Sequence, residues 1–162
     1  MTDGKANTSF RIGLFITIIA LMASIYHIIS TQWVIVSLDQ HKIIHITFGL
    51  IIVYLLSLQK ADGKANLYKK VTSVTLLLLG VLASAYLFIN YEDISNRLGL
   101  PTTEDTFLGT ILVLLVLEAT RRAWGKIIPG IVILAMLYGY FGQYLPGILY
   151  HSGLTFDRLI AY

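Results

Sequence analysis

Cysteine is absent from this chain of 162 residues, and charge is scarce in it. Without cysteine there are no disulfides, thiolate metal sites or nucleophilic thiols. The charged residues, 12 basic and 9 acidic, make up 13 % of the sequence, whereas hydrophobic residues make up 56 %. So few charges would leave most of the surface of a soluble domain bare. The composition therefore predicts a membrane protein.

Five runs of the sequence contain no charged residue at all: residues 12–38, 43–59, 71–91, 106–117 and 127–156. A helix rises about 1.5 Å per residue, so about 20 apolar residues cross a hydrocarbon core about 30 Å thick. Four runs meet or approach that length. The fourth has only 12 residues and needs the segment Glu118 to Thr120 to extend it. The pattern predicts an all-α, polytopic protein with five transmembrane helices.

The expected architecture is two helical hairpins, a four-helix unit over residues 1–122, followed by residues 123–162 as a fifth transmembrane helix and a short interfacial segment. The apolar side chains of that last segment are expected to rest on lipid, namely Leu154, Leu159 and Ile160. The first apolar run is too long for the core of a signal peptide and lacks a clear cleavage site. We expect it to remain as the first helix.

The basic residues are distributed unevenly between the two sides of this topology. Nine fall on one side: Lys5, Arg11, Lys60, Lys64, Lys69, Lys70, Arg121, Arg122 and Lys126. Three fall on the other, namely Lys42, Arg97 and Arg158. Because cytoplasmic loops carry the excess of Lys and Arg, this predicts a cytoplasmic N-terminus and a periplasmic C-terminus. The basic collar suits anionic lipid headgroups, and no nucleic-acid partner is expected because no separate basic domain exists.

A five-residue motif occurs twice, as residues 3–7 and again as residues 62–66, both reading Asp-Gly-Lys-Ala-Asn. Further on, Ala23-Ser24-Ile25-Tyr26 is similar to Ala83-Ser84-Ala85-Tyr86, 60 residues later. A period near 60 with two helices per unit would keep both units in the same orientation, as in a parallel repeat. Chance similarity between apolar segments is the alternative interpretation, and both stay open.

The search for catalytic or cofactor chemistry gives weak signals. His41 and His45 share one helical face but lack a nearby third ligand, so we expect no metal. His27 and His45 could ligate a b-type haem, which leaves a haem- or quinone-binding anchor of an oxidoreductase as an alternative function. No nucleophile arrangement or phosphate-binding glycine loop is present. The sequence therefore predicts no enzyme activity and no cofactor.

Three charged residues meet at the end of the fourth uncharged run, namely Glu118, Arg121 and Arg122. Residues three and four apart lie on the same face of a helix, so both arginines can neutralise the carboxylate. Ionisable residues inside a membrane usually mark a transport path, which is one interpretation of Glu118. We favour the other, in which the cluster is a structural ion pair that anchors the helix at the interface and to lipid.

A pattern of about 70 residues near the C-terminus supports a family resemblance. Its features are Tyr91-Glu92-Asp93, Arg97 through Gly99, Pro101-Thr102 with Asp105, Leu117-Glu118-Ala119-Thr120-Arg121-Arg122, Tyr138, Phe141-Gly142, Tyr144-Leu145-Pro146-Gly147 and Arg158-Leu159-Ile160. This stretch resembles the N-terminal part of fused permeases of the TAXI branch of tripartite ATP-independent periplasmic (TRAP) transporters. The first 90 residues match only in hydropathy and helix number.

The resemblance implies a small membrane subunit of a secondary transporter in the bacterial inner membrane. Such a four-helix unit works with a large twelve-helix permease and a periplasmic substrate-binding protein. The large unit carries ion-coupled uptake of organic acids, commonly with sodium. Fused members continue from the region matching residues 158–162 into the large unit. The chain is accordingly expected to be a separate small subunit or one part of a split permease.

Overall fold

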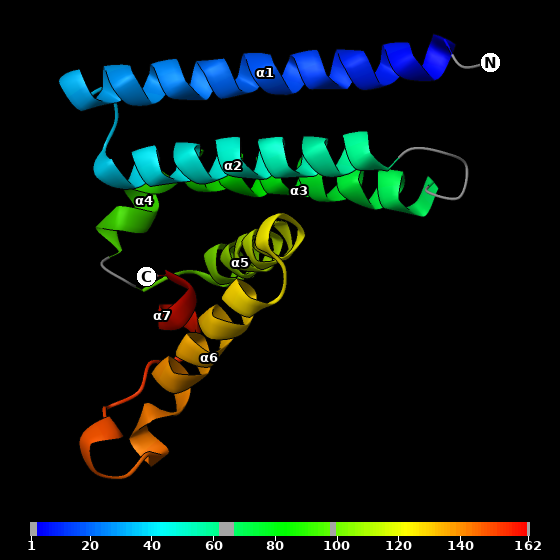
Figure 1. Cartoon of the computed structure of the whole chain (residues 1–162). Helices are drawn as coiled ribbons and strands as arrows, with labels where there is room; N and C mark the ends of the chain where they lie inside the picture. The colour runs from blue at the N-terminus through cyan, green and yellow to red at the C-terminus, as the bar shows by residue number, and fades with distance from the viewer. Residues whose placement is uncertain (1–2, 62–66, 98–99, 162) are drawn as a thin grey trace. The chain divides into compact units, whose positions relative to one another are not determined.

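The computed structural model describes residues 3–61, 67–97 and 100–161, and it contains helices and loops but no strand in these ranges (Figure 1). The prediction of an all-α protein is confirmed. The elements are α1 (Asp3–Gln32), α2 (Leu38–Lys60), α3 (Leu67–Ile89), α4 (Tyr91–Asn96), α5 (Thr103–Trp124), α6 (Ile127–Phe141), the 3₁₀ turns η2 (Gly142–Tyr144) and η3 (Gly147–Leu149), and α7 (Phe156–Ala161).

Four helical segments in the described ranges are long and apolar enough to cross a membrane: Ser9–Gln32, Leu38–Lys60, Leu67–Ile89 and Ile127–Tyr144. They are compatible with a multi-pass membrane protein. Helix α5 has 22 residues, a sufficient length, but acidic residues lie in its first turn and arginines in its last. It is the helix of the short uncharged run, so the count of five transmembrane helices stays a prediction.

Helices α1 and α2 pack against each other in antiparallel directions. Near one end, Nε2 of Gln59 donates to the carbonyl oxygen of Ser9 at 3.2 Å. Near the other, Nε2 of His27 and Nδ1 of His45 lie 2.9 Å apart. Helix α2 begins with a capping box in which Ser37 and Gln40 each bind the other's backbone N–H at 3.2 Å. This capping fixes where the chain turns back after α1.

The contacts divide the chain into two compact units, residues 1–84 and 85–162, with the boundary inside α3. The predicted division after residue 122 concerns which segment corresponds to a small subunit, and it stays a prediction. The same holds for the internal repeat. The second copy of its five-residue motif, residues 62–66, lies outside the described residues.

In the second unit the chain folds back after α6. Helix α5 contacts both α6 and α7, and α7 also contacts α6. A Cβ added to Gly109 of α5 would lie 2.7 Å from Cγ2 of Ile160, and one added to Gly139 of α6 would lie 3.1 Å from Cδ1 of Leu159. The side chains of Leu159 and Ile160 therefore pack on protein, where the sequence had led us to expect contact with lipid. The glycines permit this close approach because they have no side chain.

Candidate functional site

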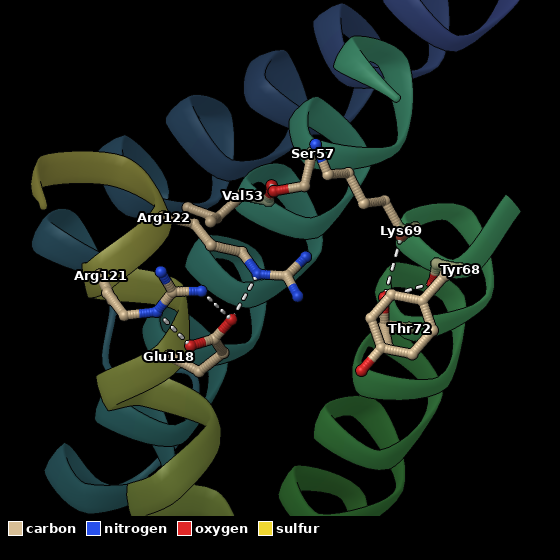
Figure 2. Close-up of polar contacts among 8 residues, drawn as sticks. All are labelled: Val53, Ser57, Tyr68, Lys69, Thr72, Glu118, Arg121 and Arg122. Carbon is tan, nitrogen blue, oxygen red and sulfur yellow. Dashed lines mark hydrogen bonds and ion pairs between the residues drawn. The ribbon is translucent and has the colours of Figure 1, made fainter. Parts of the chain in front are cut away.

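The candidate site at the end of α5 is built by the periodicity of that helix. Glu118, Arg121 and Arg122 project from successive turns on one side, so their charged groups meet (Figure 2). Nε of Arg121 donates to Oε2 of Glu118 at 2.6 Å, and its Nη2 donates to Oε1 at 2.8 Å. Nε of Arg122 donates to the same Oε1 at 2.7 Å. One carboxylate thus accepts three charge-assisted hydrogen bonds, the strong class of such bonds.

The three side chains differ in exposure, and this difference separates their roles. The exposed fraction is 49 % for Arg121, 27 % for Glu118 and 19 % for Arg122. The pKa of Glu118 is lowered to about 2. The hydrogen bond from Arg121 is the largest cause; burial raises the pKa, but the hydrogen bond from Arg122 and the positive charges of both arginines lower it further. Glu118 is therefore a carboxylate at neutral pH. The side chain of Arg121 is exposed enough to bind a further anion.

The position of the cluster also suits its net positive charge. Arg121 and Arg122 lie in the last turn of α5, where the unpaired carbonyl groups give the helix a partial negative charge. Trp124 follows with an exposed fraction of 71 %. An exposed indole beside arginines is typical of a helix end at the membrane–water interface. The lipid-anchoring role of the cluster stays a prediction.

A second polar cluster lies at the beginning of α5, around the buried carboxylate of Asp105. Thr102 caps the helix, accepting from the backbone N–H of Asp105 at 3.2 Å and donating its own N–H to Oδ2 at 2.9 Å. The hydroxyl of Tyr86 donates to Oδ1 at 3.1 Å. Nη2 of Arg97 forms an ion pair with Oδ2. The carboxylate therefore ties the loop before α5 and the end of α3 to the helix that it begins.

The environment of Asp105 keeps it ionised. Burial by itself raises the pKa of Asp105, but the hydrogen bonds from Thr102 and Tyr86 and the charge of Arg97 outweigh it and hold the pKa below its usual value. Thr102 is the N-cap of α5. The sequence analysis missed the role of Arg97 and Tyr86. Its one available signal was an arginine eight residues before an acidic residue, with a proline turn between them.

The histidines of the first unit form a chain of ring contacts at one end of the α1–α2 pair. Nδ1 of His27 donates to the carbonyl oxygen of Ala23 at 2.6 Å, and its Nε2 lies 2.9 Å from Nδ1 of His45. The hydroxyl of Tyr26 lies 3.1 Å from Nδ1 of His41. Among the described residues, no group of three metal-ligating side chains comes close enough to hold a metal ion. The contact between the two rings occupies Nε2 of His27 and Nδ1 of His45.

Comparisons with protein-family models, curated proteins and solved structures found no match for this chain.

Proposed function

We propose that the chain is the non-catalytic small membrane subunit of a TRAP-type secondary transporter. In this proposal it serves as a scaffold for a large permease subunit, which takes up organic acids with an ion gradient. A periplasmic TAXI-type substrate-binding protein delivers the substrate to the assembled transporter. The chain lies in the bacterial inner membrane with five transmembrane helices arranged as two hairpins and a fifth helix. Its N-terminus is cytoplasmic and its C-terminus periplasmic.

The observation that carries the proposal is the pairing of Glu118 with both arginines at the end of α5. Glu118 is the one acidic residue that the uncharged runs leave as a candidate for a transport path. Its carboxylate is occupied by three hydrogen bonds from Arg121 and Arg122. A group held in this way is suited to fixing the depth of a helix and less suited to binding and releasing a substrate or ion. The same residues belong to the block that resembles TAXI permeases.

The first experiment asks which proteins travel with the chain and whether it moves solute alone. Purified from native membranes in mild detergent, it should carry a large permease with about twelve predicted transmembrane helices. Proteoliposomes that contain only this chain should accumulate no organic acid. Co-purification with oxidoreductase subunits in place of a permease would contradict the proposal, and so would accumulation of solute by the chain alone.

The second experiment separates a scaffold role from a transport role for Glu118. Replacing Arg121 and Arg122 together by Ala leaves the carboxylate unpaired, at a cost of up to about 2–3 kcal/mol at a membrane centre and less near the interface. The double variant should lower recovery of the assembled transporter more than Glu118→Gln does. Arg158→Ala, which removes an exposed arginine of α7, is the matched control and should assemble normally. The opposite result would place Glu118 on a transport path: Glu118→Gln would assemble fully but not transport, while the double arginine variant would assemble and transport like the parent.

A further inference from the structure

His151 closes the fold-back between α6 and α7. Its backbone N–H donates to the carbonyl oxygen of Gly142 at 3.2 Å. Nε2 of its ring lies 3.0 Å from the carbonyl oxygen of Tyr138, and Nδ1 accepts from the backbone N–H of Gly153 at 3.0 Å. The ring also meets the ring of Tyr138 edge-on, with 4.7 Å between centroids. One side chain therefore joins the end of α6 to the segment that leads into α7.

These contacts fix the protonation state of the imidazole. A backbone N–H can only donate, so Nδ1 must present a lone pair to Gly153. A carbonyl oxygen can only accept, so Nε2 must carry the proton that it donates to Tyr138. The closed turn thus requires the neutral ring in one tautomer. The doubly protonated ring would direct an N–H at the N–H of Gly153, and that hydrogen bond would be lost.

Two glycines make room for this arrangement. A Cβ at Gly142 would lie 1.8 Å from Nε2 of His151, so any larger residue would displace the ring. Gly153 has a φ of +71°, a backbone conformation that residues with a side chain rarely adopt. Its backbone conformation aims its N–H at Nδ1. Both glycines are therefore needed for the ring to take this position.

We propose that His151 is a proton-sensitive latch that holds α7 in place at neutral pH and releases it in acid. Protonation at Nδ1 and closure of the turn exclude each other, because Nδ1 cannot carry a proton and also accept from the N–H of Gly153, so uptake of a proton favours the open turn. Next to the latch, the N–H of Leu154 donates to the carbonyl oxygen of Gly139 at 2.8 Å. Opening of the latch frees this bond and then the packing of α7.

In the described part of the chain, no charged side chain forms a hydrogen bond or ion pair with the ring of His151. The titratable group in contact with the ring is Tyr138 of α6. Asp157 and Arg158 of α7 are exposed and form no hydrogen bond or ion pair with it in the described part of the chain. On α5, Asp105 pairs with Arg97, and Glu118 pairs with its two arginines, while Glu104 is exposed. Among the described residues, no carboxylate forms an ion pair with the ring that would offset the lost hydrogen bond.

The test uses the full chain in lipid nanodiscs. Nitrogen-15 NMR of labelled histidine at pH 8, with the His151 signals assigned by their absence in His151→Ala, should show the tautomer protonated at Nε2. Hydrogen exchange over residues 150–156, corrected for the intrinsic effect of pH, should show protection that falls between pH 8 and pH 5.5, by up to about tenfold. Uptake of one proton per molecule can change the opening equilibrium by at most about tenfold for each pH unit.

Two variants assign the response to this residue. His151→Ala should lack protection in this segment at both pH values. His45→Ala, which removes a histidine of the first unit, should keep the full response. A neutral His151 protonated at Nδ1, or protection that does not change with pH, would overturn the proposal. So would a pH response that persists in His151→Ala or disappears in His45→Ala.

Discussion

Nε2 of His27 and Nδ1 of His45 lie 2.9 Å apart and share a hydrogen bond between α1 and α2. An imidazole nitrogen lies about 2 Å from a metal ion that it binds, so two nitrogens on opposite faces of a haem iron lie about 4 Å apart. The direct bond between the rings leaves no room for an iron and its porphyrin. The two helices would have to separate at this end to ligate a haem.

The purified chain should accordingly be colourless. After expression in haem-replete cells, we expect no Soret band and no haem in a pyridine haemochrome assay. His27→Ala and His45→Ala should give the same spectrum as the parent. A Soret band that disappears in either variant would instead favour an oxidoreductase anchor.

Whether α5 crosses the membrane can be tested with single cysteines, because the chain has none of its own. Glu104 and Lys126 lie just inside the beginning and just after the end of α5, and both are exposed. An impermeant thiol reagent applied to intact cells should label Glu104→Cys. It should label Lys126→Cys only after the membrane is permeabilised. Equal labelling of both in intact cells would show that α5 does not cross.

The class of fold and many helix positions could be predicted from uncharged runs, because lipid forces long apolar segments into helices. The start of α5 was also predictable, since Thr102 and Asp105 form a local capping pattern. The uncharged run alone does not give the end of α6, because it continues to residue 156, yet α6 ends at Phe141. The Pro146-Gly147 pair is the sequence signal that lies near this end.

The contacts that close the second unit lie beyond the reach of the sequence. The short helix α4 was not expected, and neither was the ion pair between Arg97 and Asp105. The ring of His151 against Gly142 joins residues from different elements. Such pairs depend on the tertiary path of the chain. The cluster around Glu118 was predictable because its members lie within one helix.

Replacing Asp105 should destabilise the second unit. Asp105→Asn removes the negative charge that forms an ion pair with Arg97 and accepts a hydrogen bond from the hydroxyl of Tyr86. A hydrogen bond to a charged group contributes about 1.5–3 kcal/mol to the free energy of unfolding. We expect a lower midpoint of thermal unfolding in detergent at pH 7. Because the pKa of Asp105 is held below its usual value, this stabilisation is present above pH 4–5, roughly, and is lost as the pH falls further.

The exposed neighbour provides the control for this prediction. Glu104 is exposed, whereas its neighbour Asp105 is buried. Replacing an exposed residue, as in Glu104→Gln, usually alters the free energy of unfolding by less than about 0.5 kcal/mol. The difference between the parent and Asp105→Asn should shrink as the pH is lowered, whereas Glu104→Gln should follow the parent. Equal unfolding midpoints for all three proteins at pH 7 would show that the cluster contributes nothing to stability.

Replacing Gly109 should displace α7 from α5. A Cβ at this position would lie 2.7 Å from Cγ2 of Ile160, and overpacking of this kind typically costs about 1–3 kcal/mol. In Gly109→Leu we expect faster hydrogen exchange over residues 156–161 than in the parent. Gly130→Leu is the matched control, because a Cβ at Gly130 meets no other atom within 4 Å. Unchanged exchange in Gly109→Leu would contradict the packing described here.

The two charged clusters of α5 set the apolar length of that helix. Between Asp105 and Glu118 lie 12 uncharged residues, or about 18 Å of helix, against a hydrocarbon core of about 30 Å. A helix that crosses with so short an apolar stretch is hydrophobically mismatched, at a cost of fractions of a kcal/mol for each Å. If α5 crosses the membrane as proposed, the bilayer beside it must become thinner, or protein must replace lipid there. Short-chain lipids should therefore suit the isolated chain better than long-chain ones, and a bound partner would remove that preference.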